Sequence, residues 1–207
     1  MRYKAIGFDY GGVIHGLPGS VFMQKAAESL GVELEALNKT YFEHNHKLNI
    51  KDISIQEVWQ DVLGALGRSD HWEQFNIFQA NEYVTKIVNP EILELMKTLR
   101  MKGYRIGILS NYNRGLREKL DEQGITPLVE AIGISVEMGC MKPQKEAFEK
   151  FCEMLAVKPQ ELIYIDDTEK SLETAKEVGY TPLLFTSYEK LIKDLTTLGV
   201  FRSEEGM

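Results

Sequence analysis

The feature that most constrains the fold is a series of short apolar segments, each the length of one buried strand, which alternate with helical patterns. The apolar segments are 4–8, 104–109, 131–136, 162–165 and 181–185. Helical patterns cover 90–102, 115–123, 144–155, 168–178 and a stretch from about 187. Repeated strand-then-helix units form a parallel sheet with helices on both faces. The pattern therefore predicts an α/β fold with a three-layer, Rossmann-like parallel sheet core.

A long region with helical periodicity alone separates the first predicted strand from the other four. Its amphipathic stretches cover roughly 20–30, 33–45, 54–66 and 70–85. Ser54 and Glu57 form a capping-box pattern at the start of the third stretch. We therefore predict a catalytic core made of residues 1–15 and 88–207, with an all-helical cap made of residues 16–87 inserted into it.

Composition limits the partners of the chain. Its 207 residues include 31 acidic and 24 basic side chains, for a formal net charge of −7, whereas a general nucleic-acid binder normally carries a basic face. No apolar run approaches the roughly 18 residues of a membrane span, and the N-terminus lacks the pattern of a signal peptide. Cys140 and Cys152 show no metal or disulfide spacing. We expect a cytoplasmic monomer or homodimer that binds neither nucleic acid nor a membrane.

Polar side chains gather at the ends of three predicted strands. Asp9 directly follows the first strand, Ser110 and Asn111 follow the second, and Asp166 and Asp167 follow the fourth. In open parallel sheets, ligands bind in the crevice at the carboxyl ends of the strands. Any one of these residues alone can be an ordinary turn or helix-cap residue, so the joint pattern carries the prediction of a site.

The types of these residues indicate phosphoryl-transfer chemistry. Asp9, Asp166 and Asp167 supply hard oxygen donors, which suit Mg²⁺ bound by carboxylates, water and a substrate phosphate. A carboxylate can also be the nucleophile and form an aspartyl-phosphate. The turn at Gly11 and Gly12 can present backbone N–H groups to an anion.

A cation is needed to balance the charges of such a site. Lys142, in the loop after the third strand, supplies one positive charge for the phosphate oxygens, and Ser110 supplies a hydroxyl. Three carboxylates and a dianionic phosphate still carry more negative charge than one lysine neutralises. The sequence therefore predicts obligatory Mg²⁺ and a small phosphorylated substrate.

Four segments carry a resemblance to a known family. FDYGGVI, ILSNYN, MKPQKEAFE and YIDDTEKSLETAKEVGY resemble, in order and spacing, the four motifs of the haloacid dehalogenase (HAD) superfamily. They look most like the phosphatase branch that has a helical cap inserted after the first motif. The resemblance covers about 1–15 and 88–187 of the chain.

The resemblance implies a role for each of the residues at the strand ends. Asp9 would be the nucleophile, and Lys142 would be the second catalytic residue. Ser110 and Lys142 would bind the phosphoryl group, and Asp166 with Asp167 would hold Mg²⁺. By the same resemblance the backbone carbonyl of Gly11 would be a further metal ligand, and Asn111 would shape the phosphate loop.

The sequence departs from the family pattern at Gly11. Most phosphatases of the superfamily have a second aspartate there as general acid and base, a role worth roughly 10²–10⁴ in rate. Three explanations stay open: His15 or a cap residue supplies the proton, the leaving group needs little protonation, or the protein turns nothing over. The pattern D-x-G-x-V is similar to that of bacterial glucose-1-phosphate phosphatases, which implies an active enzyme and a sugar phosphate substrate. Ser171 also stands where relatives often have Asn or Asp.

Two alternatives to a phosphatase remain. One is a non-catalytic protein that binds phosphorylated ligands, which Gly11 and Ser171 favour. The other, less favoured, is a haloacid dehalogenase, in which Asp166 and Asp167 would be poorly compensated charges beside the nucleophile. In the cap, the residues that could line a substrate pocket are Tyr41, His44, His46, Trp59 and Trp72.

Overall fold

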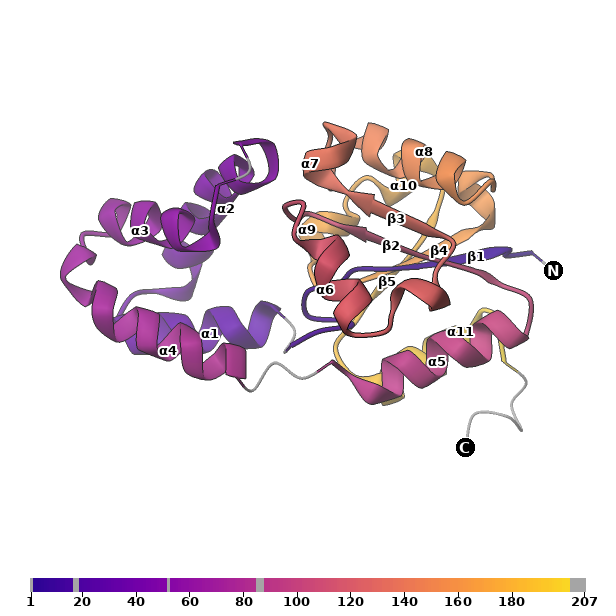
Figure 1. Cartoon of the computed structure of the whole chain (residues 1–207), viewed down its shortest axis with the longest axis horizontal. Coiled ribbons are helices and arrows are strands. Elements are labelled where there is room, and N and C mark those ends of the chain that lie inside the picture. The colour runs from indigo at the N-terminus through magenta and orange to yellow at the C-terminus, as the bar shows by residue number, and fades with distance from the viewer. Residues whose placement is uncertain (1, 17–18, 52, 85–87, 202–207) are drawn as a thin grey trace.

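The core is a five-stranded parallel sheet. The computed structural model describes residues 2–16, 19–51, 53–84 and 88–201 (Figure 1). The strands are β1 (Ala5–Phe8), β2 (Arg105–Ser110), β3 (Ala131–Ile134), β4 (Leu162–Asp166) and β5 (Thr181–Leu184). They lie in the order β3-β2-β1-β4-β5, and every pairing is parallel. The predicted α/β fold with a Rossmann-like sheet is confirmed.

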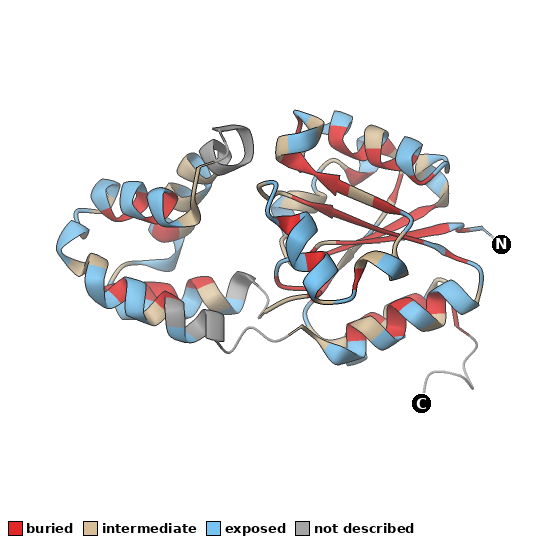
Figure 2. Ribbon diagram, in the orientation of Figure 1, coloured by how far each residue is buried: buried red, intermediate tan, exposed pale blue. Residues whose placement is uncertain are grey.

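Helices cover both faces of the sheet (Figure 1). On one face lie α5 (Pro90–Met101), α6 (Leu116–Glu122) and α11 (Tyr188–Thr197), and on the other lie α8 (Lys145–Met154) and α10 (Ala175–Val178). Each face buries its own apolar cluster, the first under α5, α6 and α11 and the second under α8 and α10. Along β4, Ile163 and Ile165 belong to the first cluster, whereas Leu162 and Tyr164 belong to the second. This alternation buries the strands on both sides, as Figure 2 shows in red.

Two predicted elements end differently in the structure. The strand predicted over 131–136 stops at Ile134, and α7 (Ser135–Met138) begins there. The hydroxyl of Ser135 exchanges hydrogen bonds with the backbone N–H and C=O of Tyr112, which holds Ser135 outside the sheet ladder. The helix predicted over 168–178 is two short helices, α9 (Glu169–Leu172) and α10. At the two ends of α9, the backbone N–H groups of Ser171 and Glu173 donate to carbonyls three residues back, which makes these ends tight turns.

The segment between β1 and α5 forms four helices with an apolar cluster of their own, which we call the helical insert. They are α1 (Gly19–Leu30), α2 (Leu34–Lys51), α3 (Ile55–Ala65) and α4 (Trp72–Val84). The helix predicted over 33–45 extends to Lys51, and the capping box of Ser54 and Glu57 is present. Three-residue 3₁₀ helices lie at Ser69–His71, Thr126–Leu128 and Pro159–Glu161.

The chain enters and leaves the helical insert at neighbouring positions. The backbone N–H of Asn89 donates to the carbonyl of Ile14 at 2.8 Å, and His15 forms a β-bridge with Val88. The division of the chain at residues 15 and 88 stays a prediction. Within the described ranges, no helix has the length and apolar character needed to cross a bilayer.

Two glycines allow α8 to approach the sheet closely. Gly7 and Gly107 are register partners on β1 and β2. A Cβ atom would lie 2.6 Å from the Phe151 ring at Gly7 and 2.8 Å from it at Gly107. The Phe151 ring of α8 therefore occupies the space above both glycines, and it belongs to the second apolar cluster.

We expect Gly107→Ala to lower the free energy of unfolding by about 1–3 kcal/mol, because the added methyl group overpacks the space that the Phe151 ring fills. Urea unfolding measures the loss. Phe151→Leu removes the ring atoms that the methyl group meets, so the two substitutions together should lower stability by less than the sum of their separate effects. Strictly additive losses would contradict this packing.

Candidate active site

The predicted polar residues meet where the strand order reverses, at the carboxyl ends of β1, β2 and β4. Asp9 follows β1 directly. Ser110 and Asp166 do not follow their strands, as the sequence had suggested, but are the last residues of β2 and β4. They remain in the sheet because Ser110 pairs with Ile134 and Asp166 pairs with Leu184.

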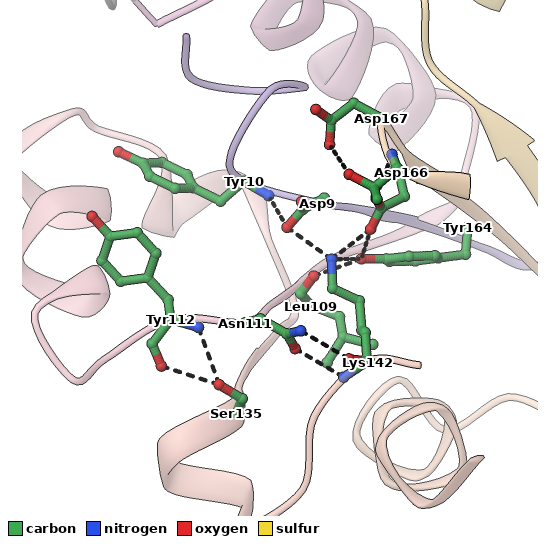
Figure 3. Close-up of polar contacts among 11 residues, drawn as sticks. Asp9, Tyr10, Leu109, Asn111, Tyr112, Ser135, Lys142, Tyr164, Asp166 and Asp167 are labelled. Carbon is green, nitrogen blue, oxygen red and sulfur yellow. Dashed lines mark hydrogen bonds and ion pairs between the residues drawn. The ribbon is translucent and has the colours of Figure 1, made fainter. Parts of the chain in front are cut away.

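Lys142 joins two of the carboxylates. Its Nζ atom lies 3.0 Å from Asp9 Oδ1 and 2.5 Å from Asp166 Oδ2 (Figure 3). The side chains of Lys142 and Asp166 are 2% and 0% exposed, and that of Asp9 is 13% exposed. A buried ammonium needs such anionic partners, so the lysine is part of the site rather than a solvated loop residue.

Asn111 fixes the backbone of Lys142. Its amide nitrogen donates to the carbonyl of Lys142 at 2.9 Å, and its amide oxygen accepts from the backbone N–H of Lys142 at 2.8 Å. The peptide bond between Lys142 and Pro143 is cis. The side-chain amide of Asn111 therefore holds the segment that carries the lysine. The role predicted for Asn111 in shaping a phosphate loop stays a prediction.

Tyr164 is a functional residue that the sequence reasoning missed. Its hydroxyl accepts from Lys142 Nζ at 2.9 Å and donates to the carbonyl of Leu109 at 2.6 Å. Tyr164 and Asp166 are two residues apart on β4, so they point to the same face. A tyrosine within an otherwise aliphatic buried strand needs a partner for its hydroxyl, and this was the available signal.

The electrostatics of the site depend on burial. Burial raises the pKa of Asp9, the charge of Asp166 raises it too, and Lys142 and Ser110 act in the opposite direction. Together they place this pKa at about 6. For Lys142, burial alone would lower the pKa, but Asp166 and Asp9 outweigh this effect and raise it. Lys142 therefore stays an ammonium ion. Asp9 changes between its protonated and ionised forms near pH 6, close to neutral pH.

The carboxylates fit a divalent cation. Oxygen atoms of Asp9, Asp166 and Asp167 all lie within 4.8 Å of one another, and this set of hard donors suits Mg²⁺. Asp9 and Asp167 line the adjacent cavity. The oxygens of Asp166 already accept from Lys142 and from the backbone N–H of Thr168. Within the trio, Asp9 and Asp166 thus both hold the lysine, and Asp166 is the fully buried one of the two.

The turn after Asp9 differs from the prediction at one glycine. The N–H of Gly12 donates to the carbonyl of His15 at 2.9 Å, so it is not presented to an anion as predicted. The turn closes on itself instead, and the ring of His15 stacks on Tyr10 with 5.2 Å between centroids. Gly11 is exposed, and no atom lies within 4 Å of where its Cβ would be.

Gly12 has a different function, which is to leave room for Asp167. Its φ is +74°, a left-handed conformation that favours glycine. A Cβ atom at this position would overlap the carboxylate of Asp167. The turn after β1 and the acidic pair after β4 are therefore packed against each other.

A cavity of about 620 Å³ lies between the core and the helical insert. Asp9, Asp167 and Lys142 line it from the core, and Tyr41 and Trp59 line it from the insert, as the sequence suggested. The other insert candidates do not line it: His44 bonds the carbonyl of Thr40, and Trp72 packs in the apolar cluster of the insert. The side chain of His46 falls outside the part of the chain that is described.

We expect Gly12→Ala to separate stability from metal binding. The left-handed backbone costs an alanine about 1–2 kcal/mol, and the Asp167 carboxylate must also rotate away. Gly103→Ala is the matched control, because Gly103 has a φ of +89° and open space around a Cβ. Both variants should lose stability, and Gly12→Ala should lose more because the Asp167 carboxylate must also move. Only Gly12→Ala should bind Mg²⁺ more weakly, by roughly tenfold or more in calorimetry. Equal affinities would contradict the proposed role of Gly12.

We also expect Asp9→Asn to be more stable than the wild type near neutral pH when a chelator removes metal ions. The raised pKa means that folding opposes ionisation, so the wild type loses stability as pH rises from about 4 to about 6. The stability difference should grow by roughly 2–3 kcal/mol across this window in urea unfolding. A difference that does not change with pH would show that burial of Asp9 does not oppose its ionisation.

Comparisons with known proteins identify the family of the chain. A family profile of haloacid dehalogenase-like hydrolases matches residues 3–179. The phosphoglycolate phosphatase of Aquifex aeolicus is 26% identical over 172 residues, which cover 82% of this chain and 78% of that protein.

Solved structures show the same fold. A dehalogenase superposes with a TM-score of 0.64 at 18% identity, covering 90% of this chain and 86% of the other. A HAD-family enzyme of Bacteroides thetaiotaomicron superposes with a TM-score of 0.61 at 20% identity, covering 92% of this chain and 98% of the other. A second structure of that enzyme, with a TM-score of 0.55, is a complex with magnesium and inorganic phosphate. The chain belongs to the haloacid dehalogenase-like hydrolases.

Proposed function

We propose that the protein is a Mg²⁺-dependent phosphatase that cleaves a small phosphate monoester through an aspartyl-phosphate on Asp9. One observation carries this proposal. The Asp9 carboxylate lines the cavity, is held 3.0 Å from the Lys142 ammonium, and lies within 4.8 Å of two further carboxylates. A nucleophile, a fixed cation and a set of metal donors therefore meet at one point.

The reaction follows from these positions. A carboxylate oxygen of Asp9 attacks phosphorus, the new bond forms, and the bond from phosphorus to the ester oxygen breaks. Lys142 and the hydroxyl of Ser110 stabilise the charge on the phosphoryl oxygens. Water then hydrolyses the aspartyl-phosphate, which releases phosphate and restores Asp9.

The metal would be held by Asp9, Asp167, the carbonyl of Gly11 and, as predicted, Asp166. When bound, Mg²⁺ supplies positive charge that offsets the carboxylates and the phosphate. Lys142 adds one positive charge beside Asp9 and Asp166, so three carboxylates and this ammonium leave the cluster negative. The HAD-family enzyme that was solved with magnesium and phosphate supports this proposal.

The acidic pair favours phosphatase over dehalogenase chemistry. Structural likeness does not separate the two, because a dehalogenase and a HAD phosphatase of Thermococcus onnurineus both superpose on this chain. Cleavage of a carbon–halogen bond needs no metal, so Asp166 and Asp167 would only add repulsion beside Asp9. The 26% identity to a phosphoglycolate phosphatase supports the same choice. A sugar phosphate remains the substrate class that the pattern D-x-G-x-V suggests.

The helical insert would act as a cap. We propose that residues 16–87 form a separate unit that closes over the core and excludes water from the site. The ring of His15 stacks on Tyr10 and does not line the cavity, so His15 has little support as the missing acid. The cytoplasmic location and the monomeric or dimeric state also remain predictions.

A panel of phosphate monoesters assayed for phosphate release tests the function. It should include sugar 1-phosphates, sugar 6-phosphates and phosphoglycolate, each with Mg²⁺ and with a chelator. We expect release with Mg²⁺ and loss of activity in the chelator, because the cluster is negative without the cation. Asp9→Asn should lower kcat by at least about 10³, because it removes the nucleophile.

Asp121→Asn is the matched control, since it makes the same chemical change on the exposed surface of α6 and should leave activity unchanged. Activity that survives both the chelator and Asp9→Asn would refute the mechanism. Ligand-induced stabilisation without phosphate release from any ester would favour the alternative, a non-catalytic protein that binds phosphorylated ligands.

A further inference from the structure

The larger cavity has two chemically different walls. The core side is polar and holds the phosphate chemistry described above. The insert side is apolar, with Phe22, Met23, Tyr41, Phe42, Ile55 and Trp59. Among the described residues that line this cavity, the insert adds few polar groups, which are the amides of Asn38 and Asn45 and the single polar atoms of the Tyr41 and Trp59 rings, and no charged side chain. The part of a substrate beyond its phosphate would therefore meet mostly carbon.

Phe42 presents the face of its ring to the cleft. The residue lies on α2 and is 39% exposed, one of the few large apolar side chains that are not covered. The Lys170 Nζ atom, from α9 of the core, lies over the ring at 5.7 Å from its centroid. A cation lies over the face of a ring and not at its edge, and Lys170 belongs to the core. One face of the Phe42 ring is therefore turned toward the core, across the cavity.

The Phe42 ring is backed by other aromatic rings. The rings of Tyr41 and Phe42 meet edge to face, with 5.9 Å between their centroids. The centroid of the Tyr41 ring lies 4.8 Å from that of the Trp59 ring. Trp59 is buried and also contacts Phe75, deep in the apolar cluster of the insert. The aromatic wall is thus anchored in a packed core, so its shape is set before a ligand arrives.

From this wall we propose that the cavity binds a planar aromatic ring, so that the preferred substrates are phosphate monoesters with a heteroaromatic group, of the kind found in nucleoside monophosphates. The inference rests on the proposed phosphatase function and narrows its substrate class. An exposed ring face gains free energy when another flat ring covers it. A polyol would need many hydrogen-bond partners, and the described lining from the insert offers two amides, one phenol hydroxyl and one indole N–H.

The dimensions and the position of Lys170 agree with this substrate class. A cavity of about 620 Å³ is within the range of pockets that hold ligands larger than a simple sugar phosphate. The Lys170 side chain is exposed, and its ammonium group makes a cation–π contact with the ring of Phe42. A long, solvated side chain can move aside at little cost when a ring stacks on Phe42.

The test compares two substrates that differ only in the ring. Adenosine 5′-monophosphate and the 5-phosphate of methyl riboside share the same primary phosphate and the same sugar, so the reactivity of the ester is matched. Base–aromatic stacking predicts a kcat/KM at least about tenfold higher for the nucleotide with Mg²⁺ present. Phe42→Leu should bring this ratio down toward one.

Phe78→Leu is the matched control. Phe78 contacts Phe22 and Phe75 in the same apolar cluster but does not line the cavity, so the variant should keep the ratio of the wild type. If both variants lower the ratio equally, the effect comes from disturbed packing of the insert, and the assignment of Phe42 is wrong. Equal kcat/KM values for the two substrates in the wild type would overturn the inference and leave the phosphatase function standing.

A binding measurement covers the case in which no ester is hydrolysed. Calorimetry on Asp9→Asn, with Mg²⁺ and the same two ligands, measures the ring preference without turnover. Tighter binding of the nucleotide that Phe42→Leu removes would support the ring site even if the phosphatase function fails. Equal affinities would refute the ring site, whatever the outcome of the activity assay.

Discussion

The site depends on the buried ammonium of Lys142. An unpaired charge with 2% exposure would be strongly destabilising, so the chain must supply anions around it. Asp9 and Asp166 meet this need, and in doing so they connect the ends of β1 and β4 to the loop after α7. Tyr164 and Asn111 then fix the ammonium and the backbone of the same lysine. The ion pairs that stabilise the buried lysine therefore also place the residues that we propose for catalysis.

Much of this site could be predicted from the sequence, because parallel strands place their carboxyl ends at one edge. That rule alone brings Asp9, Ser110 and Asp166 together before any coordinates are known. The rule says nothing about which carboxylate pairs with the lysine, since this depends on loop geometry. The hydroxyl of Tyr164 was missed for the same reason, because it bonds Lys142 from another segment of the chain. The inward-turned N–H of Gly12 was missed because it depends on the local geometry of the turn, which closes on the carbonyl of His15.

The fold separates the two tasks of recognition. The sheet and its short loops fix the polar groups rigidly, because Phe151 packs onto Gly7 and Gly107 and holds α8 tight against the strands. The helical insert buries its own apolar cluster and contributes carbon surface to the cavity. The phosphate end of a ligand therefore meets groups held by the sheet, and the other end meets a wall that can change without disturbing them.

Gly11 links the electrostatics to the chemistry of the leaving group. Burial and the neighbouring Asp166 already hold the pKa of Asp9 at about 6, and an aspartate at position 11 would add a fourth negative charge to this cluster. Glycine avoids that repulsion and leaves open space above the turn, which is wide enough for water to approach. In the mechanism that we propose, the site would keep Asp9 ionisable near neutral pH and would leave protonation of the departing oxygen to solvent or substrate. The rate would then depend more on the leaving group than on the phosphate.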